Sequence, residues 1–119
     1  MGRLTQTLSS AMSDVLHLAE IPYESGPIEF RYARVMSADG TRWIRHGLFV
    51  HYSEEGTVLA EGSYANGSED GLWRSFHRNG NIAAEGHYRA GLEVGVWRFW
   101  SADGASQPDV VHESYAAHG

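Results

Sequence analysis

The feature that most constrains this chain of 119 residues is an internal repeat with a period of 24 residues. One tripeptide pattern occurs three times at this offset, as Gly47-Leu48-Phe49, Gly71-Leu72-Trp73 and Gly95-Val96-Trp97. Other positions stay in the same register: Gly56 with Gly80 and Gly104, Glu61-Gly62 with Glu85-Gly86, Tyr64 with Tyr88. Two full units (47–70 and 71–94) precede half of a third (95–104). Each unit is therefore expected to be one small element that packs against its neighbours.

Glycine marks the internal structure of each unit. The chain has 14 glycines, near 12% where roughly 7% is usual. Five of them alternate at spacings of 11 and 13 residues: Gly56, Gly67, Gly80, Gly91 and Gly104. The dipeptides Asn66-Gly67, Asn79-Gly80 and Asp103-Gly104 tolerate the positive φ of hairpin turns. Aromatic and β-branched residues lie between the turns, so the pattern predicts one β-hairpin per unit and an antiparallel β-meander overall.

Degenerate copies flank the array. Residues 23–46 are interpreted as an opening hairpin, with a strand from Glu29 to Met36, a turn at Asp39-Gly40 and a second strand through Trp43. Residues 105–119 are interpreted as a C-terminal strand and tail, in which Val110 to Glu113 returns after an insertion containing Pro108.

The N-terminal segment has a different pattern. Apolar residues at helical spacing predict an amphipathic α-helix from about residue 7 to 20, within a cap of residues 1–22: Leu8, Met12, Val15, Leu16 and Ala19. Pro22 is expected to end this helix. Covering the end of the sheet is the first interpretation, and docking onto a partner is the alternative.

Composition excludes several classes of function. No cysteine means no disulfide and no thiolate nucleophile, and a net charge of −6 argues against nucleic-acid binding. No apolar run approaches the roughly 18 residues of a membrane span, so a cytoplasmic protein is expected. The seven histidines lack the helical spacing of a metal site; His51 and His77 are expected to approach one another, but without a third ligand. No nucleophile elbow or phosphate loop is present, so no catalytic residue, metal or cofactor is predicted.

Aromatic residues three positions apart are the first candidate site. The pairs Phe49/Tyr52, Trp73/Phe76 and Trp97/Trp100 should point to opposite faces of a regular strand. Either a bulge near Gly71 and Gly95 re-aims one member, or both faces carry aromatic side chains. Core packing is expected for Trp73 and Trp97, and partial exposure for Tyr52, Tyr64 and Tyr88.

Charge is unevenly distributed along the chain. Residues 54–70 contain five acidic residues and no arginine: Glu54, Glu55, Glu61, Glu69 and Asp70. Residues 31–45 contain four arginines against Asp39 alone. The acidic segment is either a surface for a basic partner or a solvated strand edge that discourages aggregation. Glu61 and Glu85 are expected to pair across strands with Arg74 or Arg98.

The repeat resembles the bacterial variant of the MORN (membrane occupation and recognition nexus) repeat. The likeness rests on the segment from Glu61 to Trp73 and its copy from Glu85 to Trp97, and it extends over residues 47–104. The resemblance implies a single-layer antiparallel meander of stacked hairpins without catalytic residues. Some bacterial proteins of this kind are described as antitoxins or immunity proteins, whereas eukaryotic relatives are associated with scaffolding, membranes and lipid head groups.

The sequence therefore predicts a mainly β, non-enzymatic protein-binding module. The resemblance favours an immunity protein that occludes the active site of a basic toxin, such as a nuclease or deaminase. The residues expected to contact this partner are Glu54, Glu55, Glu69, Asp70, Tyr52, Tyr64, Tyr88 and Trp100. The alternative is a scaffold that forms homo-oligomers through its open sheet edge or sits near membranes.

Overall fold

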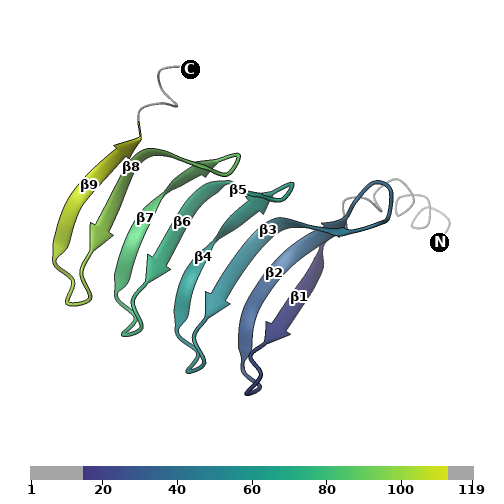
Figure 1. Cartoon of the computed structure of the whole chain (residues 1–119), viewed down its shortest axis with the longest axis horizontal. Helices are drawn as coiled ribbons and strands as arrows, with labels where there is room; N and C mark the ends of the chain where they lie inside the picture. Colours follow the sequence, from purple (N-terminus) through teal and green to yellow (C-terminus); the bar gives the residue numbers. More distant parts are fainter. Residues whose placement is uncertain (1–14, 113–119) are drawn as a thin grey trace, which may run out of the picture.

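A computed structural model describes residues 15–112, which form a single antiparallel sheet of nine strands (Figure 1). The strands are β1 (His17–Pro22), β2 (Ile28–Met36), β3 (Trp43–Tyr52), β4 (Val58–Ala65), β5 (Ser68–Glu69), β6 (Gly71–Phe76), β7 (Ile82–Arg89), β8 (Leu92–Trp100) and β9 (Ser106–His112). They lie in chain order across the sheet, and the short β5 pairs with β4 beside β6. The sheet is one curved layer with dimensions of 57 × 45 × 25 Å. The predicted antiparallel meander is confirmed.

Turns of two kinds close the hairpins. At one end of the sheet, five-residue segments are closed by backbone hydrogen bonds of 2.7 to 2.8 Å: Tyr23 to Pro27, Ser53 to Thr57, His77 to Asn81, and Ser101 to Ala105. At the other end, the tight turns Asn66-Gly67 and Ala90-Gly91 have positive φ at both residues. This combination matches the right-handed twist of the flanking strands. The predicted turns at Gly67, Gly80 and Gly104 are confirmed.

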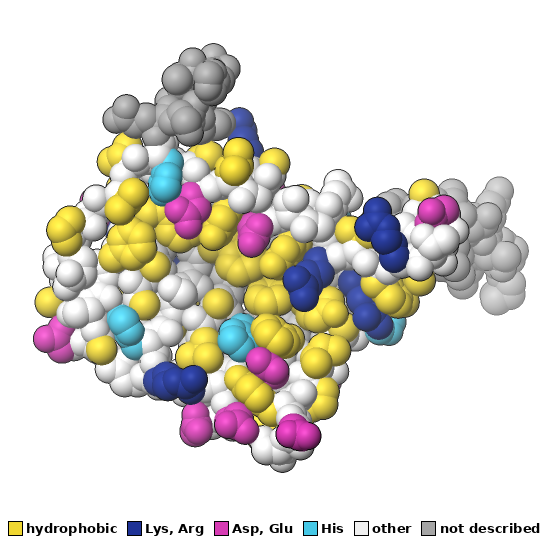
Figure 2. Space-filling model, viewed as in Figure 1, with side chains coloured by type: hydrophobic (Ala, Val, Ile, Leu, Met, Phe, Trp, Pro, Cys, Tyr) yellow, Lys and Arg dark blue, Asp and Glu magenta, His cyan; other side chains and the backbone are white. Residues whose placement is uncertain are grey.

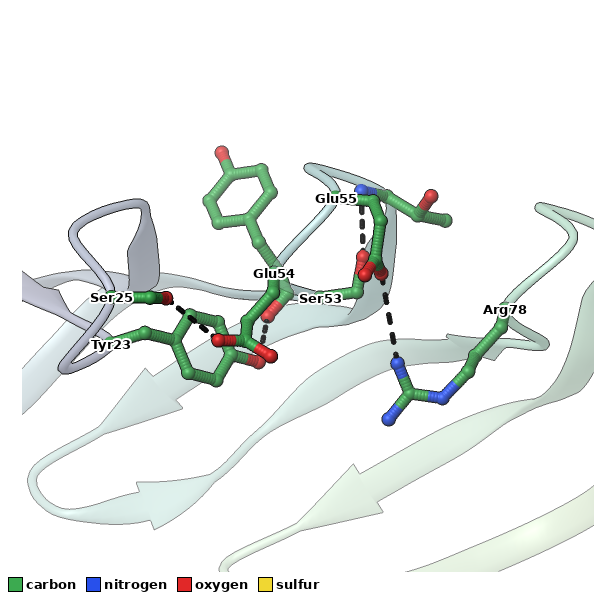
Figure 3. A network of polar contacts seen from close by, with 8 residues as sticks. Tyr23, Ser25, Ser53, Glu54, Glu55 and Arg78 are labelled. Carbon is green, nitrogen blue, oxygen red and sulfur yellow. Dashed lines mark hydrogen bonds and ion pairs between the residues drawn. The ribbon is translucent and has the colours of Figure 1, made fainter.

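Hydrogen bonds between turns connect each hairpin to the next. The backbone N–H of Gly67 donates to the carbonyl of Arg45, and that of Gly91 donates to the carbonyl of Glu69, both at 2.9 Å. At the opposite end, the Tyr23 hydroxyl donates to the carbonyl of Tyr52 at 2.6 Å. Figure 3 shows this second set of loops, where Ser25 also donates to the Glu54 carboxylate. The spacing between hairpins is therefore fixed at both ends.

The two faces of the sheet differ in chemistry. We call one the aromatic face, defined by Phe49, Tyr64, Trp73, Tyr88 and Trp97, whose rings contact one another. We call the other the charged face, defined by Glu61, Arg74, Glu85 and Arg98, which lie opposite one another on adjacent strands. Alternation along the strands places Tyr52, Phe76 and Trp100 on the charged face. Gly71 and Gly95 have positive φ, but they precede the aromatic pairs, so both faces carry aromatic side chains.

The aromatic face contains the core of the protein. Tyr64 meets Phe49 and Trp73 edge to face, with ring centroids 5.4 Å apart in each case. Tyr88 meets Trp73 and Trp97 in the same way at 5.8 and 5.1 Å. Aromatic pairs prefer this geometry because the positive edge of one ring approaches the negative face of another. Trp97 is buried and Trp73 half-buried, so the core role predicted for Trp97 is confirmed and that of Trp73 is confirmed in part.

Two glycines leave the space that the side chains of Trp73 and Trp97 occupy. A Cβ atom on Gly62 would lie 2.1 Å from Cδ2 of Trp73, and one on Gly86 would lie 2.1 Å from Cδ2 of Trp97. Each indole therefore lies directly on the backbone of the neighbouring strand. There Nε1 of Trp73 donates to the carbonyl of Ser63 at 2.9 Å, and Nε1 of Trp97 donates to that of His87 at 3.1 Å.

The predicted N-terminal helix is wrong where the structure describes it. Residues 17–22 form β1, which pairs with β2 over the register His17 to Arg34 through Pro22 to Ile28, and the described residues contain no helix. Residues 7–14 of the prediction lie outside the described range. The buried Ala19 packs opposite Tyr32. An open β2 edge offers unpaired backbone groups, and pairing them outweighs a short helical periodicity.

The C-terminal strand is longer than predicted. Pro108 lies inside β9 rather than in an insertion, at a register shift opposite the segment between Trp97 and Phe99. Because β9 is an edge strand, a residue without an N–H group is tolerated there.

Candidate functional site

A row of charged residues crosses the charged face from β1 to β8. On adjacent strands, Glu20 lies opposite Arg31, Arg31 lies opposite Val50, and Val50 lies opposite Glu61. The row continues through Arg74, Glu85 and Arg98. Its ion pairs are Glu20 with Arg31 at 2.8 Å, and Arg74 with Glu85 at 2.7 Å and Glu61 at 3.8 Å. The predicted cross-strand pairing of Glu61 and Glu85 with Arg74 is confirmed.

Apolar side chains border this charged row on one side. Leu48, Leu72 and Val96 occupy the same repeat position, and 46%, 38% and 47% of their respective surfaces are exposed. Two shallow hollows separate them: one of about 260 Å³ between Leu48 and Leu72, and one of about 230 Å³ between Leu72 and Val96. We call Leu48, Leu72 and Val96 the apolar row. The sequence analysis missed it, although the repeat register combined with strand alternation would have placed the three residues together.

Three predicted contact residues lie together at the edge of the charged face. Tyr52, Glu54 and Glu55 line a hollow of about 310 Å³ with Arg31 and Pro27. The Arg31 guanidinium lies 5.6 Å from the centre of the Tyr52 ring, and its Nη1 donates to the Tyr52 hydroxyl at 3.1 Å. Glu55 also lies 3.9 Å from Arg78 of the next loop, as Figure 3 shows.

Three other predicted residues lie on the aromatic face. Tyr64 is opposite Glu69 across the β4–β5 pair, and Tyr88 lies beside them in the ladder of rings. Burial raises the pKa of both tyrosines, and nearby carboxylates raise it further, Glu69 for Tyr64 and Glu93 for Tyr88. Both hydroxyls therefore stay protonated as hydrogen-bond donors at neutral pH. Tyr52, Tyr64 and Tyr88 are all partly exposed, as predicted.

The acidic segment 54–70 is distributed over separate places. Glu54 and Glu55 lie in the loop before β4, whereas Glu69 and Asp70 lie beyond its far end. An eight-residue strand spans about 26 Å, so these two groups are at opposite ends of the sheet. Glu61 lies between them in the charged row, and Trp100 ends β8, at the same end of the sheet as Glu54 and Glu55 but on a separate hairpin. A partner would contact these acidic residues at two or more distinct points.

The two histidines considered for metal binding, His51 and His77, make separate contacts. His51 stacks on Phe30 with ring centroids 4.5 Å apart, and His77 forms a 2.8 Å hydrogen bond with the carbonyl of Trp100. Within residues 15–112, no three His, Cys, Asp or Glu side chains are grouped as a metal site requires. The same part of the chain contains no helix long and apolar enough to span a membrane.

Comparison with known families supports the repeat assignment. The profile of the family described as MORN repeat variant matches residues 45–66 and 69–90. These two adjacent segments of the chain are similar to the MORN repeat variant. Each matched segment contains a forward strand, a loop and a returning strand, and ends at the first positive-φ residue of a tight turn, Asn66 or Ala90. Each segment that matches the family is therefore a β-hairpin. No curated protein and no solved structure matches the chain significantly.

Proposed function

We propose that this MORN-repeat chain is a protein-binding module whose partner covers the charged face. The observation that carries the proposal is the apolar row, in which the same repeat position is apolar and exposed three times. A monomer gains no stability from keeping such side chains in water, whereas an interface removes them from it. On the aromatic face, by contrast, the rings already pack against one another and against glycine.

The charged face also has the layout of a protein interface. The apolar row and the aromatic residues Tyr52, Phe76 and Trp100 border the row of ion pairs. Interfaces combine aromatic anchors with polar groups that fix orientation. Because the ion pairs are already formed within the sheet, a partner meets preorganised charges rather than mobile side chains.

Substitution within the apolar row tests this proposal. Binding to the partner should be lost in Leu72→Asp, because a carboxylate would be desolvated at the centre of the interface. The matched control is Leu92→Asp, since Leu92 is an exposed leucine (70%) in the β7–β8 hairpin outside the row. A captured protein qualifies as the partner when wild type and Leu92→Asp retain it and Leu72→Asp loses it. If Leu72→Asp and Leu92→Asp retain the partner equally well, the partner does not bind the charged face.

We further propose that the partner is a basic toxin, acting in the cytoplasm, whose active site this surface occludes. The family resemblance supports this form of the function, and so does the hollow formed by Tyr52, Glu54 and Glu55 at the edge of the charged face. Its carboxylates would meet the basic residues that bind substrate phosphates in a nuclease.

Activity assays separate the toxin proposal from simple binding. One equivalent of this chain should abolish the catalytic activity of the captured partner. The double charge reversal Glu54→Lys/Glu55→Lys should weaken inhibition, whereas Glu69→Lys/Asp70→Lys, at the far end of β4, serves as the comparison. A stoichiometric complex whose partner keeps full activity would contradict toxin neutralisation while leaving the binding module intact.

Self-association is a second candidate, favoured by the two edges of the sheet, β1 and β9, which have no further strand beside them among residues 15–112. β1 exposes Leu18 and Ile21, and β9 exposes Val110 and Val111. Unpaired edges are templates for strand addition, although Pro108 within β9 limits pairing on that side. Sedimentation velocity of the isolated chain should show a mass that rises with concentration if the edges pair, and a constant monomer mass if they do not.

A further inference from the structure

The β2–β3 hairpin gathers three arginines around one groove, on the opposite side of the sheet from the apolar row. The groove has a volume of about 420 Å³, and Arg34, Arg42, Arg45, Tyr32, Trp43 and Asn66 contribute to its walls. Figure 2 shows basic side chains gathered at this end of the sheet, next to hydrophobic ones. The fourth arginine of the hairpin, Arg31, points to the charged face, where it pairs with Glu20.

The register of the hairpin brings two of these positive charges together. Arg34 and Arg45 are directly opposite each other on β2 and β3. Like charges in this position destabilise a sheet. Within residues 15–112, no carboxylate oxygen lies within 4.0 Å of a guanidinium nitrogen of Arg34, Arg42 or Arg45. The nearest acid in the sequence, Asp39, instead accepts hydrogen bonds from Ser37 and Thr41.

Aromatic rings hold two of the guanidinium groups in place. The Arg34 guanidinium carbon lies 4.2 Å from the centre of the Trp43 ring. That of Arg45 lies 5.0 Å from the Tyr32 ring and 5.5 Å from the Tyr64 ring. A stacked guanidinium uses its face for the ring and keeps N–H donors at its edge for a carboxylate. The guanidinium groups of Arg34 and Arg45 are therefore preorganised without a carboxylate partner among the described residues, and Nε of Arg34 donates to Nδ1 of His17 at 3.1 Å.

We propose that this groove binds an acidic peptide segment of a partner protein, in which Asp or Glu residues flank an apolar one. Trp43 and Ile44 separate Arg42 from the facing pair Arg34 and Arg45, so the positive charge lies at two positions, which suits two carboxylates spaced along an extended chain. The net charge of −6 opposes extended polyanions such as nucleic acid or an anionic membrane, because the remainder of the surface repels them. This site is independent of the proposed contact through the apolar row.

A synthetic peptide tests the proposal by fluorescence titration of the full chain. The probe is a blocked pentapeptide in which glutamate alternates with leucine, and the control peptide has glutamine in place of glutamate. Trp43, 44% exposed beside Arg34, should change its emission on binding. We expect the glutamate peptide to bind at least tenfold more tightly than the control, and its affinity to fall as salt is raised from 50 to about 500 mM because added ions screen the charges.

Variants assign the binding to the groove. Arg45→Gln and Arg42→Gln should each weaken binding of the glutamate peptide about tenfold. Arg42 is exposed, so Arg42→Gln tests the groove even if Arg45→Gln disturbs the packing of the rings. Arg98→Gln, an exposed arginine on the charged face, and Leu72→Asp should bind as wild type does. The proposal is overturned if both peptides bind equally, if Arg98→Gln matches Arg42→Gln, or if inorganic phosphate or vesicles with anionic lipid bind where the peptide does not.

Discussion

Adding one methyl group beneath an indole provides a quantitative test of the aromatic core. Gly62→Ala places a Cβ atom 2.1 Å from Cδ2 of Trp73, about 1.3 Å short of the 3.4 Å at which ordinary contact begins. Overpacking of this kind costs about 1 to 3 kcal/mol. Shifting the indole also weakens its 2.9 Å hydrogen bond to Ser63, worth about 1 kcal/mol. Alanine in a strand recovers about 0.5 to 1 kcal/mol relative to glycine, so we expect a net loss of about 1 to 3.5 kcal/mol.

A double-mutant cycle with Trp73→Leu isolates this contact. Urea unfolding followed by circular dichroism gives the free energy of unfolding for the wild type, both single variants and the double variant. Without the indole, Gly62→Ala should be neutral or should stabilise the protein, because only the backbone preference of alanine is left. The reasoning is refuted if Gly62→Ala costs the same in both backgrounds, or if it stabilises the wild type.

Three further predictions concern the loops and the charged row. Ser53→Ala should lower the free energy of unfolding by about 1 to 2 kcal/mol in urea titrations, because Ser53 is 1% exposed and its hydroxyl accepts a hydrogen bond from the Thr57 N–H. Hydrogen bonds from Ser37 and Thr41 lower the pKa of Asp39 to about 2. The stabilisation from Asp39 is therefore present above pH 4 and lost as the pH falls from about 4 to 2, and melting curves of Asp39→Asn should lack this dependence. Glu85→Gln should cost about 0.5 kcal/mol and Glu61→Gln less, since Glu85 is closer to Arg74, and added salt should reduce the difference between the two melting temperatures.

The fold could be predicted because residues with special backbone conformations, above all those in tight turns, recur at a fixed spacing in the sequence. Asn66-Gly67 lies in a tight turn because both residues must adopt positive φ, a demand that few other dipeptides meet. The pairing of Glu85 with Arg74 followed from the same register. The N-terminal prediction failed because helical spacing from residue 8 to 19 describes the segment alone, whereas β1 forms because its backbone pairs with the free edge of β2, the next strand along the chain.

The candidate site was harder to predict than the fold, because proximity in sequence differs from proximity in a sheet. Glu55 and Glu69 belong to one acidic segment but lie at opposite ends of β4, while Arg34 and Arg45, on either side of a turn, are directly opposite in space. In the sequence, Gly62 and Gly86 could be recognised only as equivalent positions of the repeat. Their role depends on the indole side chains that reach them from the next strand.

The most direct test of the central claim is site-specific photo-crosslinking to the partner from the two faces of the sheet. A photoreactive amino acid at position 72 or 96 reports on the charged face, and one at position 75 on the aromatic face. We predict crosslinks from positions 72 and 96 and none from position 75. Crosslinks from position 75 alone would contradict the proposal that the partner covers the charged face.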